Sequence, residues 1–190
     1  LHALGKGVRG EHLLKTGVGN FKLVNEKFID RHLAFGRFIG RIHALGAVEP
    51  FRYRPTIDIA GFGEEPRAFL LNNAWIPTDL LPAYSSVIDH ALAGVRACFA
   101  RAGRVEHLRL HGDCHLGNLL WTEPRKDDGN DQARNVHIVD LDDCRTGPAV
   151  QDLWMLLSGS RADMEQQLGD ILTGYTQFMD FDASELALLE

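Results

Sequence analysis

The side chains best suited to chemistry lie in one short stretch of the chain, residues 108–121. This stretch contains His111, Asp113 and Asn118 in the spacing His-x-Asp-x-x-x-x-Asn. A carboxylate fixed at Asp113 can accept the proton of an attacking hydroxyl, and an amide oxygen five residues later suits a hard cation such as Mg²⁺. Asp113 is therefore the candidate catalytic base, and Asn118 is a candidate metal ligand.

A second acidic segment follows the short apolar run at residues 136–139. Asp140 comes directly after that run, and Asp142 and Asp143 lie within three residues of it. Alternate side chains of an extended strand share a face, so Asp140 and Asp142 are expected on one face and Asp143 on the other. Asp140 is the first choice as a second Mg²⁺ ligand, with Asp142 as a supporting group. A base with two oxygen ligands suits phosphoryl transfer, which depends on positioned Mg²⁺ and an aligned nucleophile.

Three further residues are candidates for supporting roles. His111 is expected to brace the loop by hydrogen bonding, whereas His115 could contact substrate or phosphate, or only pack. Asp152 lies near the start of the next predicted helix, where a carboxylate can cap backbone donors and support the loop. Cys114 and Cys144 could join His115 as zinc ligands, but no Cys-x-x-Cys or His-x-x-x-His pair favours this reading.

The elements that must position these residues are helices and short strands. Helical spacing of the apolar residues predicts helices over residues 28–45, 80–102, 149–158 and 163–179. Short strands are expected at residues 105–110, 119–122 and 136–141. This order predicts an α+β protein, mainly helical, whose small sheet or hairpin carries the catalytic and metal-binding loops.

Each predicted helix has an apolar face that is expected to point toward the core. In the first helix, Gly36 and Gly40 share a face and would permit close packing, whereas His43 is expected on the wetter side as a structural or exposed residue. The residues expected to face the core include Leu45, Val87, Ala91, Val95, Trp154 and Phe178.

Three segments carry turn or capping signals. Residues 47–77 contain four prolines and are expected to be a loop with short extended pieces. Residues 123–135 are polar and predict a solvated hairpin loop, which places the charged run 126–131 away from the site. Asp182 and Glu185 form an N-cap and capping-box pattern, so a further helix is expected to begin there.

Composition and charge narrow the class of protein. The 190 residues are 45% hydrophobic and 24% charged, which is average for a soluble domain. The net charge of −6 gives no reason to expect binding to nucleic acid or to an anionic membrane, and no apolar run approaches the roughly 20 residues of a membrane span. The odd number of widely spaced cysteines favours a reducing cytoplasm. These residues are Cys98, Cys114 and Cys144. We expect a monomer.

Residues 1–27 are interpreted as a glycine-rich leader. Residues 5–10 match Gly-x-Gly-x-x-Gly in form, but the motif indicates a phosphate loop only after a strand, and residues 1–4 are too short to supply one. The chain starts at Leu1 and ends inside the helix expected near Asp182, so we expect a piece of a longer protein.

Taken together, these motifs resemble the signature of the aminoglycoside phosphotransferase and choline kinase superfamily, and within it the bacterial stress response kinase A group. The resemblance covers residues 33–190 and rests on segments 111–118, 139–143 and 147–157, with further similarity at 36–43, 53–57 and 178–190. It implies a protein-kinase-like C-terminal lobe over residues 28–190, truncated at both ends. The N-terminal lobe is expected to be missing, because neither a strand pair with a glycine-rich loop nor a nucleotide-binding lysine is recognisable before the first helix.

The resemblance also implies an activity and a ligand set. It implies a cytoplasmic kinase that uses ATP and Mg²⁺ to phosphorylate Ser/Thr hydroxyls of proteins. Asp113 would be the catalytic aspartate, and Asn118 and Asp140 the Mg²⁺ ligands.

Two alternatives remain open. A small-molecule hydroxyl kinase of the aminoglycoside, choline or homoserine type needs the same base and metal ions. The second alternative is a non-catalytic kinase-like fragment. Residues 1–190 alone are expected to be inactive, because the lysine that binds the phosphates of the nucleotide belongs to the N-terminal lobe.

Overall fold

The structure is a computed structural model that describes residues 14–15, 20–23, 29–122 and 136–189. Its helices are α1 (Ile29–Gly46), α2 (Glu65–Asn72), α3 (Leu81–Ala102), α4 (Val150–Trp154) and α5 (Arg161–Tyr175). One sheet has the strand order β1 (Leu14–Lys15), β2 (Asn20–Leu23), β4 (Leu119–Thr122) and β5 (Val136–Ile138), and a second sheet pairs β3 (Leu108–Leu110) with β6 (Arg145–Gly147). The mainly helical α+β class predicted from the sequence is confirmed for these residues.

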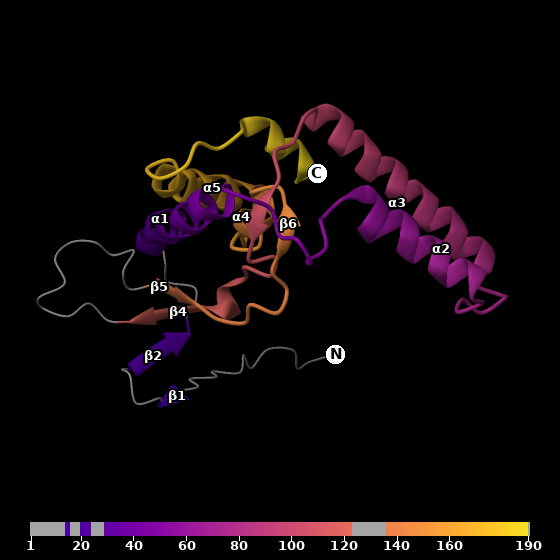
Figure 1. The fold of residues 1–190 in the computed structure, drawn as a ribbon, viewed down its shortest axis with the longest axis horizontal. Coiled ribbons are helices and arrows are strands. Elements are labelled where there is room, and N and C mark those ends of the chain that lie inside the picture. Colours follow the sequence, from indigo (N-terminus) through magenta and orange to yellow (C-terminus); the bar gives the residue numbers. More distant parts are fainter. Residues whose placement is uncertain (1–13, 16–19, 24–28, 123–135, 190) are drawn as a thin grey trace, which may run out of the picture.

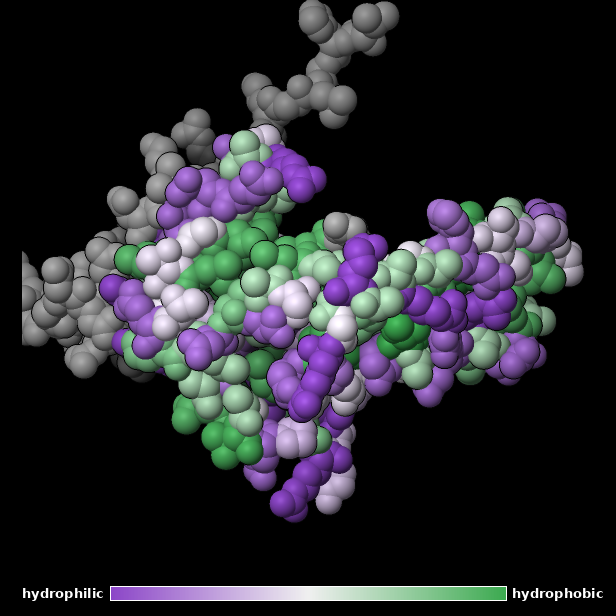
Figure 2. Space-filling model, turned by 90° about the horizontal axis from the view of Figure 1, so that it is seen from above, coloured by the Kyte–Doolittle hydropathy of each residue, from purple (hydrophilic) through white to green (hydrophobic). Residues whose placement is uncertain are grey.

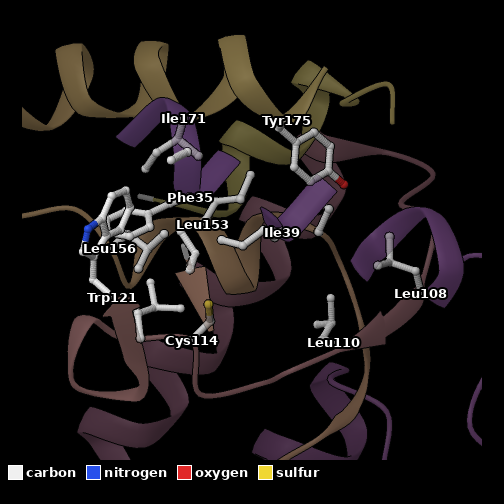
Figure 3. Packing of buried hydrophobic residues seen from close by; sticks show 14 residues of the cluster. Phe35, Ile39, Leu108, Leu110, Cys114, Trp121, Leu153, Leu156, Ile171 and Tyr175 are labelled. Atoms are coloured by element: carbon white, nitrogen blue, oxygen red, sulfur yellow. The ribbon is translucent and has the colours of Figure 1, made fainter. Parts of the chain in front are cut away.

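Helices α1 and α5 pack against each other, and α1 also contacts β3 and β5 (Figure 1). The core lies between these elements and receives Phe35 and Ile39 from α1 and Ile171 and Tyr175 from α5, all at most 2% exposed. Trp121 of β4 meets the Phe35 ring edge-on with ring centroids 6.4 Å apart (Figure 3). One apolar cluster therefore joins the helices to the strands that flank the candidate site.

Glycines bring the backbones of α1 and α5 close together. A β-carbon built on Gly36 would lie 1.9 Å from the carbonyl oxygen of Ile171, and one built on Gly40 would lie 2.7 Å from that of Tyr175. Gly174 of α5 returns the contact, since its β-carbon would lie 2.1 Å from the carbonyl oxygen of Leu33. The expectation that Gly36 and Gly40 permit close helix packing is confirmed.

Two short strands are described near the start of the chain. Strands β1 and β2 pair antiparallel, and β2 pairs antiparallel with β4, in a register that sets Leu23 opposite Leu120. These two short strands are not predicted by the sequence analysis, and the absence of a strand pair with a glycine-rich loop stays an expectation. The glycine motif at residues 5–10 lies outside the described residues.

Residues 47–77 are not only a loop. A π-helical turn at Ala60–Glu64 leads directly into α2, and Pro66 lies in the first turn of that helix. Proline is tolerated there because the first amides of a helix have no intrahelical partner, so this proline marks a helix start rather than a break. One extended piece is present as expected, since Thr56 forms a parallel bridge with Thr146 of β6.

Helices α2 and α3 form an arm that extends away from the rest of the protein (Figure 1). Val87 and Val95 are 69% and 41% exposed, and Ala91 is exposed too, so their predicted core-facing positions are wrong. Figure 2, in which the arm extends to the right, shows hydrophobic residues interspersed with hydrophilic ones along it. Helical periodicity identifies an apolar stripe but not whether another element covers it.

Three other predicted core residues are also exposed. Leu45 is 76% exposed, Trp154 is 45% exposed and Phe178 is 42% exposed. Leu45 lies in the last turn of α1, whereas Trp154 and Phe178 lie at or just beyond the ends of α4 and α5, which are shorter than predicted. Near a helix end the packed neighbours run out, so the periodic pattern overestimates burial. Within the described parts of the chain, no helix is both long and apolar enough to cross a membrane.

Candidate active site

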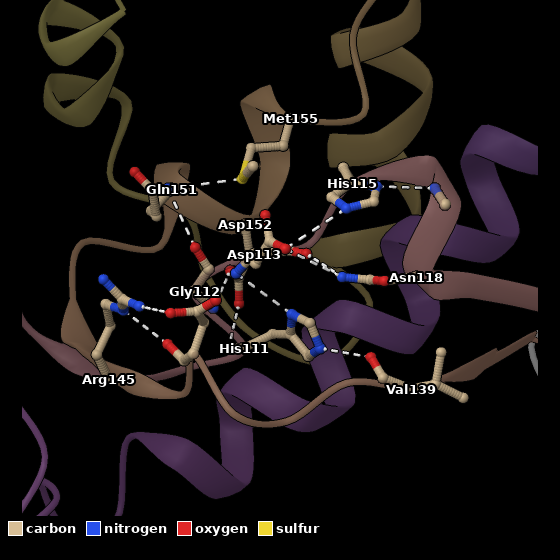
Figure 4. A network of polar contacts seen from close by, with 12 residues as sticks. His111, Gly112, Asp113, His115, Asn118, Val139, Arg145, Gln151, Asp152 and Met155 are labelled. Carbon is tan, nitrogen blue, oxygen red and sulfur yellow. Dashed lines mark hydrogen bonds and ion pairs between the residues drawn. The ribbon is translucent and has the colours of Figure 1, made fainter.

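The candidate base and the candidate metal ligand lie together in the loop between β3 and β4. The amide nitrogen of the Asn118 side chain donates to the backbone oxygen of Asp113 at 3.0 Å and to its carboxylate Oδ2 at 3.2 Å (Figure 4). Asn118 is 8% exposed, whereas the Asp113 side chain is 34% exposed. The loop thus anchors Asn118 while the carboxylate of Asp113 stays accessible to a substrate.

This arrangement fixes the orientation of the Asn118 amide. An amide oxygen facing the carbonyl and carboxylate oxygens of Asp113 would be repelled, so the nitrogen takes that side and the oxygen is left as the other polar atom. An amide oxygen is a ligand that Mg²⁺ accepts. The donor chemistry of Asn118 therefore fits a magnesium ion.

The second acidic segment is tied to the same loop through its backbone. The Val139 amide donates to the backbone oxygen of Asn118 at 3.0 Å, and the His111 ring Nε2 lies 3.0 Å from the Val139 oxygen. The His111 Nδ1 also accepts the Asp113 amide at 3.3 Å, which leaves Nε2 as the protonated atom that donates to Val139. His111 thus links the loop to the residue that directly precedes Asp140.

The geometry of the acidic segment differs from the prediction. Strand β5 ends at Ile138, and Asp140 has a φ of 64°, in the left-handed region. Strand alternation therefore does not apply, and the argument that Asp140 and Asp142 share a strand face is wrong. Asp140 and Asp142 are both exposed, the Asp142 backbone oxygen accepts from Arg54, and the Asp143 carboxylate pairs with Arg145. Asp140 retains an accessible carboxylate next to the residue bonded to Asn118.

Among the described residues, no three His, Cys, Asp or Glu side chains gather into a metal-binding cluster. Mg²⁺ is usually held by one or two carboxylates together with waters and phosphate oxygens rather than by a full protein cage. Asn118 and Asp140 match such a partial set. The charged run 126–131 lies outside the described residues, although β4 and β5 on either side of it do pair antiparallel.

Asp152 of α4 holds the backbone of the catalytic loop. Its Oδ2 accepts the His111 amide at 2.7 Å and lies 3.0 Å from Nε2 of His43, and its Oδ1 accepts the Gly112 amide at 2.8 Å. Gly112 has a φ of 86°, and a β-carbon there would lie 2.2 Å from the Asp143 oxygen. The buried carboxylate, 1% exposed, thus fixes the two residues that precede Asp113.

His43 completes this network from α1. Its side chain is 0% exposed, and its Nδ1 lies 3.0 Å from the hydroxyl of Tyr175, so its expected place on the wetter face is wrong. Burial, together with Glu185 and Asp152, raises the pKa of Tyr175. His43 follows Phe35 and Ile39 at intervals of four, so the helical pattern does place it on the buried stripe. No comparable pattern in the sequence indicates Tyr175 as the partner of His43.

Glu185 does not take the predicted capping-box position. The segment Ala183–Leu188 is a 3₁₀ helix capped by Asp182, and the Glu185 carboxylate is 3% exposed and accepts the Val150 amide at 2.8 Å. It therefore caps α4, the helix that carries Asp152. Burial raises the pKa of Glu185 to about 7, against the opposing effect of the Val150 hydrogen bond.

The raised pKa of Glu185 predicts a pH-dependent stability. The folded protein holds a proton on Glu185 that the unfolded chain releases above its ordinary pKa of 4.5, so this contribution falls as the pH rises through about 7. Relative to Glu185→Gln, we expect the free energy of unfolding to decrease by about 2–3 kcal/mol between pH 5 and pH 8. Glutamine keeps an acceptor for Val150 but does not titrate. Urea unfolding of both proteins at both pH values measures the difference, and identical pH dependence would contradict the assignment.

The cysteines are free thiols in the described structure. Cys114 is 1% exposed within the apolar cluster, and burial, with Asp152 and Asp113 nearby, raises the pKa of its thiol. Burial likewise raises the pKa of Cys144. Cys114 is therefore a small core residue, and its side chain attaches the catalytic loop to the apolar cluster (Figure 3).

The fold is similar to that of solved kinase structures. It is similar to the solved structure of a microcompartment-associated aminopropanol kinase, with a TM-score of 0.58 and 16% identity over 94% of this chain and 58% of that one. It is also similar to an amicoumacin kinase solved with AMP-PNP and Ca²⁺, with a TM-score of 0.56 and 18% identity over 81% of this chain and 45% of that one. A mainly helical, kinase-like fold is thereby shown.

The chain belongs to the phosphotransferase enzyme family, which it matches over residues 6–189. It is 41% identical over 162 residues to stress response kinase A of Escherichia coli K12, and 40% identical to the serine/threonine protein kinase RdoA of Salmonella typhimurium LT2. Each match covers 85% of this chain and 45% of the relative, so the chain spans about half the length of these curated relatives. The similarity to the stress response kinase A group expected from the motifs is confirmed.

Proposed function

We propose that the protein containing this chain transfers a phosphoryl group from ATP to Ser/Thr hydroxyls of proteins, with Mg²⁺ as cofactor. The observation that carries the proposal is the geometry of the catalytic loop. In this loop the Asn118 side chain donates to the Asp113 carboxylate, and the Asn118 backbone oxygen accepts from Val139, the residue before Asp140. The serine/threonine kinase name of a relative at 40% identity supports protein substrates. The free cysteines fit the reducing cytoplasm as the location.

In this proposal each residue has one task. Asp113 orients the acceptor hydroxyl and takes its proton as the hydroxyl oxygen bonds to the γ-phosphorus of ATP and the bond from that phosphorus to ADP breaks. The Asn118 amide oxygen and the Asp140 carboxylate would hold Mg²⁺, which would neutralise negative charge on the phosphate that is transferred. His111 and Asp152 keep the loop in place through the backbone contacts described above.

A small-molecule kinase is the second candidate. The solved structures that share the fold are kinases of aminopropanol and amicoumacin by name, and such acceptors need the same base and metal ligands. The relative at 40% identity that is named a serine/threonine protein kinase favours the protein substrate.

A transfer assay separates the candidates. The complete gene product that contains residues 1–190 is incubated with radiolabelled ATP and Mg²⁺, and casein and myelin basic protein are compared with choline, aminopropanol and an aminoglycoside. We expect labelled Ser/Thr in protein and loss of transfer when EDTA removes the metal. Label on a small molecule alone would overturn the protein-kinase proposal, and no transfer to any acceptor would overturn phosphotransfer itself.

A further inference from the structure

The two carboxylate oxygens of Asp113 have different surroundings. Its Oδ2 lies 3.2 Å from the Asn118 amide nitrogen and 3.4 Å from Nε2 of His115 (Figure 4). Both contacts are to the same oxygen, so Oδ1 is the oxygen they leave for another partner. The carboxylate is thus oriented as well as held.

The loop also determines which nitrogen of His115 bears the proton. Nδ1 accepts the Gly117 amide at 2.9 Å, as the cap of the 3₁₀ turn Leu116–Asn118. A ring nitrogen that accepts a hydrogen bond is unprotonated, so the neutral ring carries its proton on Nε2. That nitrogen is the one that faces Asp113. The cap therefore presents a donor to the candidate base.

Gly117 leaves the room that this ring position requires. A β-carbon at Gly117 would lie 2.6 Å from Cε1 and 2.9 Å from Nδ1 of His115. The backbone of Gly117 is not among the positive-φ residues of the described chain, so alanine is compatible with its conformation. A methyl group here would displace the His115 ring without altering the chemistry of either side chain at the site.

We propose that His115 is a positioning residue for Asp113. Its Nε2–H and the Asn118 amide together hold Oδ2, so that Oδ1 is presented to the hydroxyl of the acceptor. This role rests on the proposed phosphoryl transfer. The His115 side chain is 45% exposed, so it lies at the open side of the loop, where the acceptor must approach.

Three variants of the complete gene product test this role. His115→Asn keeps an acceptor for the Gly117 amide but removes the donor to Asp113, whereas His115→Gln places an amide donor near the position of Nε2. Gly117→Ala displaces the ring instead. For each variant, kcat, the KM for ATP, the KM for casein as acceptor and the thermal unfolding midpoint are measured.

We expect His115→Asn and Gly117→Ala to lower kcat about 10- to 100-fold with the KM for ATP within about twofold of the parent value. His115→Gln should recover most of kcat. The double variant of Gly117→Ala with His115→Asn should be no slower than His115→Asn alone. Both substitutions remove the same contact, the one between His115 and Asp113, so their effects should not add.

Several outcomes would overturn the role of His115. They are a kcat of His115→Asn within twofold of the parent, equal losses in His115→Asn and His115→Gln, or an effect confined to the KM for ATP, which would indicate a phosphate contact instead. These outcomes leave the proposed function intact. Absence of transfer by the unsubstituted protein would overturn the proposed function and this role together. Nitrogen NMR of His115 supplies a readout without catalysis, and a neutral ring protonated on Nδ1 would contradict the proposal.

Discussion

Asp113→Asn is expected to lower kcat by about 10³-fold or more while the protein stays folded. Asparagine is close to aspartate in shape but cannot take the proton of the acceptor hydroxyl, and such proton transfer is worth roughly 10²–10⁴ in rate. The side chain is 34% exposed, and the contacts of its carboxylate within the described chain are to Asn118 and His115 of the same loop, so an amide in its place should cost little stability. Steady-state phosphoryl transfer and thermal unfolding measure the two halves of this prediction.

A surface substitution controls for the loss of one negative charge. Glu165 lies on α5 and is 68% exposed in an ion pair with Arg161, so Glu165→Gln should leave kcat unchanged. An Asp113→Asn enzyme with near-normal turnover would remove Asp113 from the role of base.

Asp152→Ala is expected to cost about 3–5 kcal/mol of folding free energy. Its carboxylate receives the amides of His111 and Gly112 and faces Nε2 of His43, all within 3.0 Å. Removing a buried carboxylate leaves these donors without an acceptor in a site that water does not reach, and the cost of such a loss exceeds that of an ordinary hydrogen bond. Urea unfolding at neutral pH gives the difference in free energy.

The neighbouring residue on α4 offers a matched control. Gln151 also reaches the catalytic loop, but through a 3.4 Å contact from its side-chain nitrogen to the Gly112 oxygen, and it is only half-buried. Gln151→Ala should therefore cost less than about 1 kcal/mol. A cost for Asp152→Ala as small as that of Gln151→Ala would show that the loop does not depend on the buried carboxylate.

The parts of the site that the sequence predicted are those encoded locally. Asp113 and Asn118 are five residues apart, and one turn of loop brings them into contact. Strand β4 occupies the predicted residues 119–122 because its apolar pattern is short and bounded by polar segments. The Mg²⁺ role of Asn118 and Asp140 stays a prediction.

The parts that the sequence missed depend on contacts between distant segments. His43 and Asp152 are 109 residues apart, and Glu185 reaches Val150 across 35 residues. Local pattern assigns a histidine or a glutamate to a helix face or a cap, but it does not reveal which distant group shares its hydrogen bonds. The left-handed turn at Asp140 was missed for a related reason, since an apolar run does not show where pairing with β4 ends.

The contact between α1 and α5 limits how these helices can vary in sequence. At Gly36 and Gly174 the facing atoms are backbone carbonyl oxygens of Ile171 and Leu33, so the fit does not depend on which side chains the opposite helix carries. A larger side chain in a core can be accommodated when a neighbouring side chain is replaced by a smaller one, but no substitution removes a backbone carbonyl. A replacement at either glycine therefore has no second-site substitution that restores the packing. Among sequences that keep this helix pair, these two positions should vary less than the leucines and isoleucines around them.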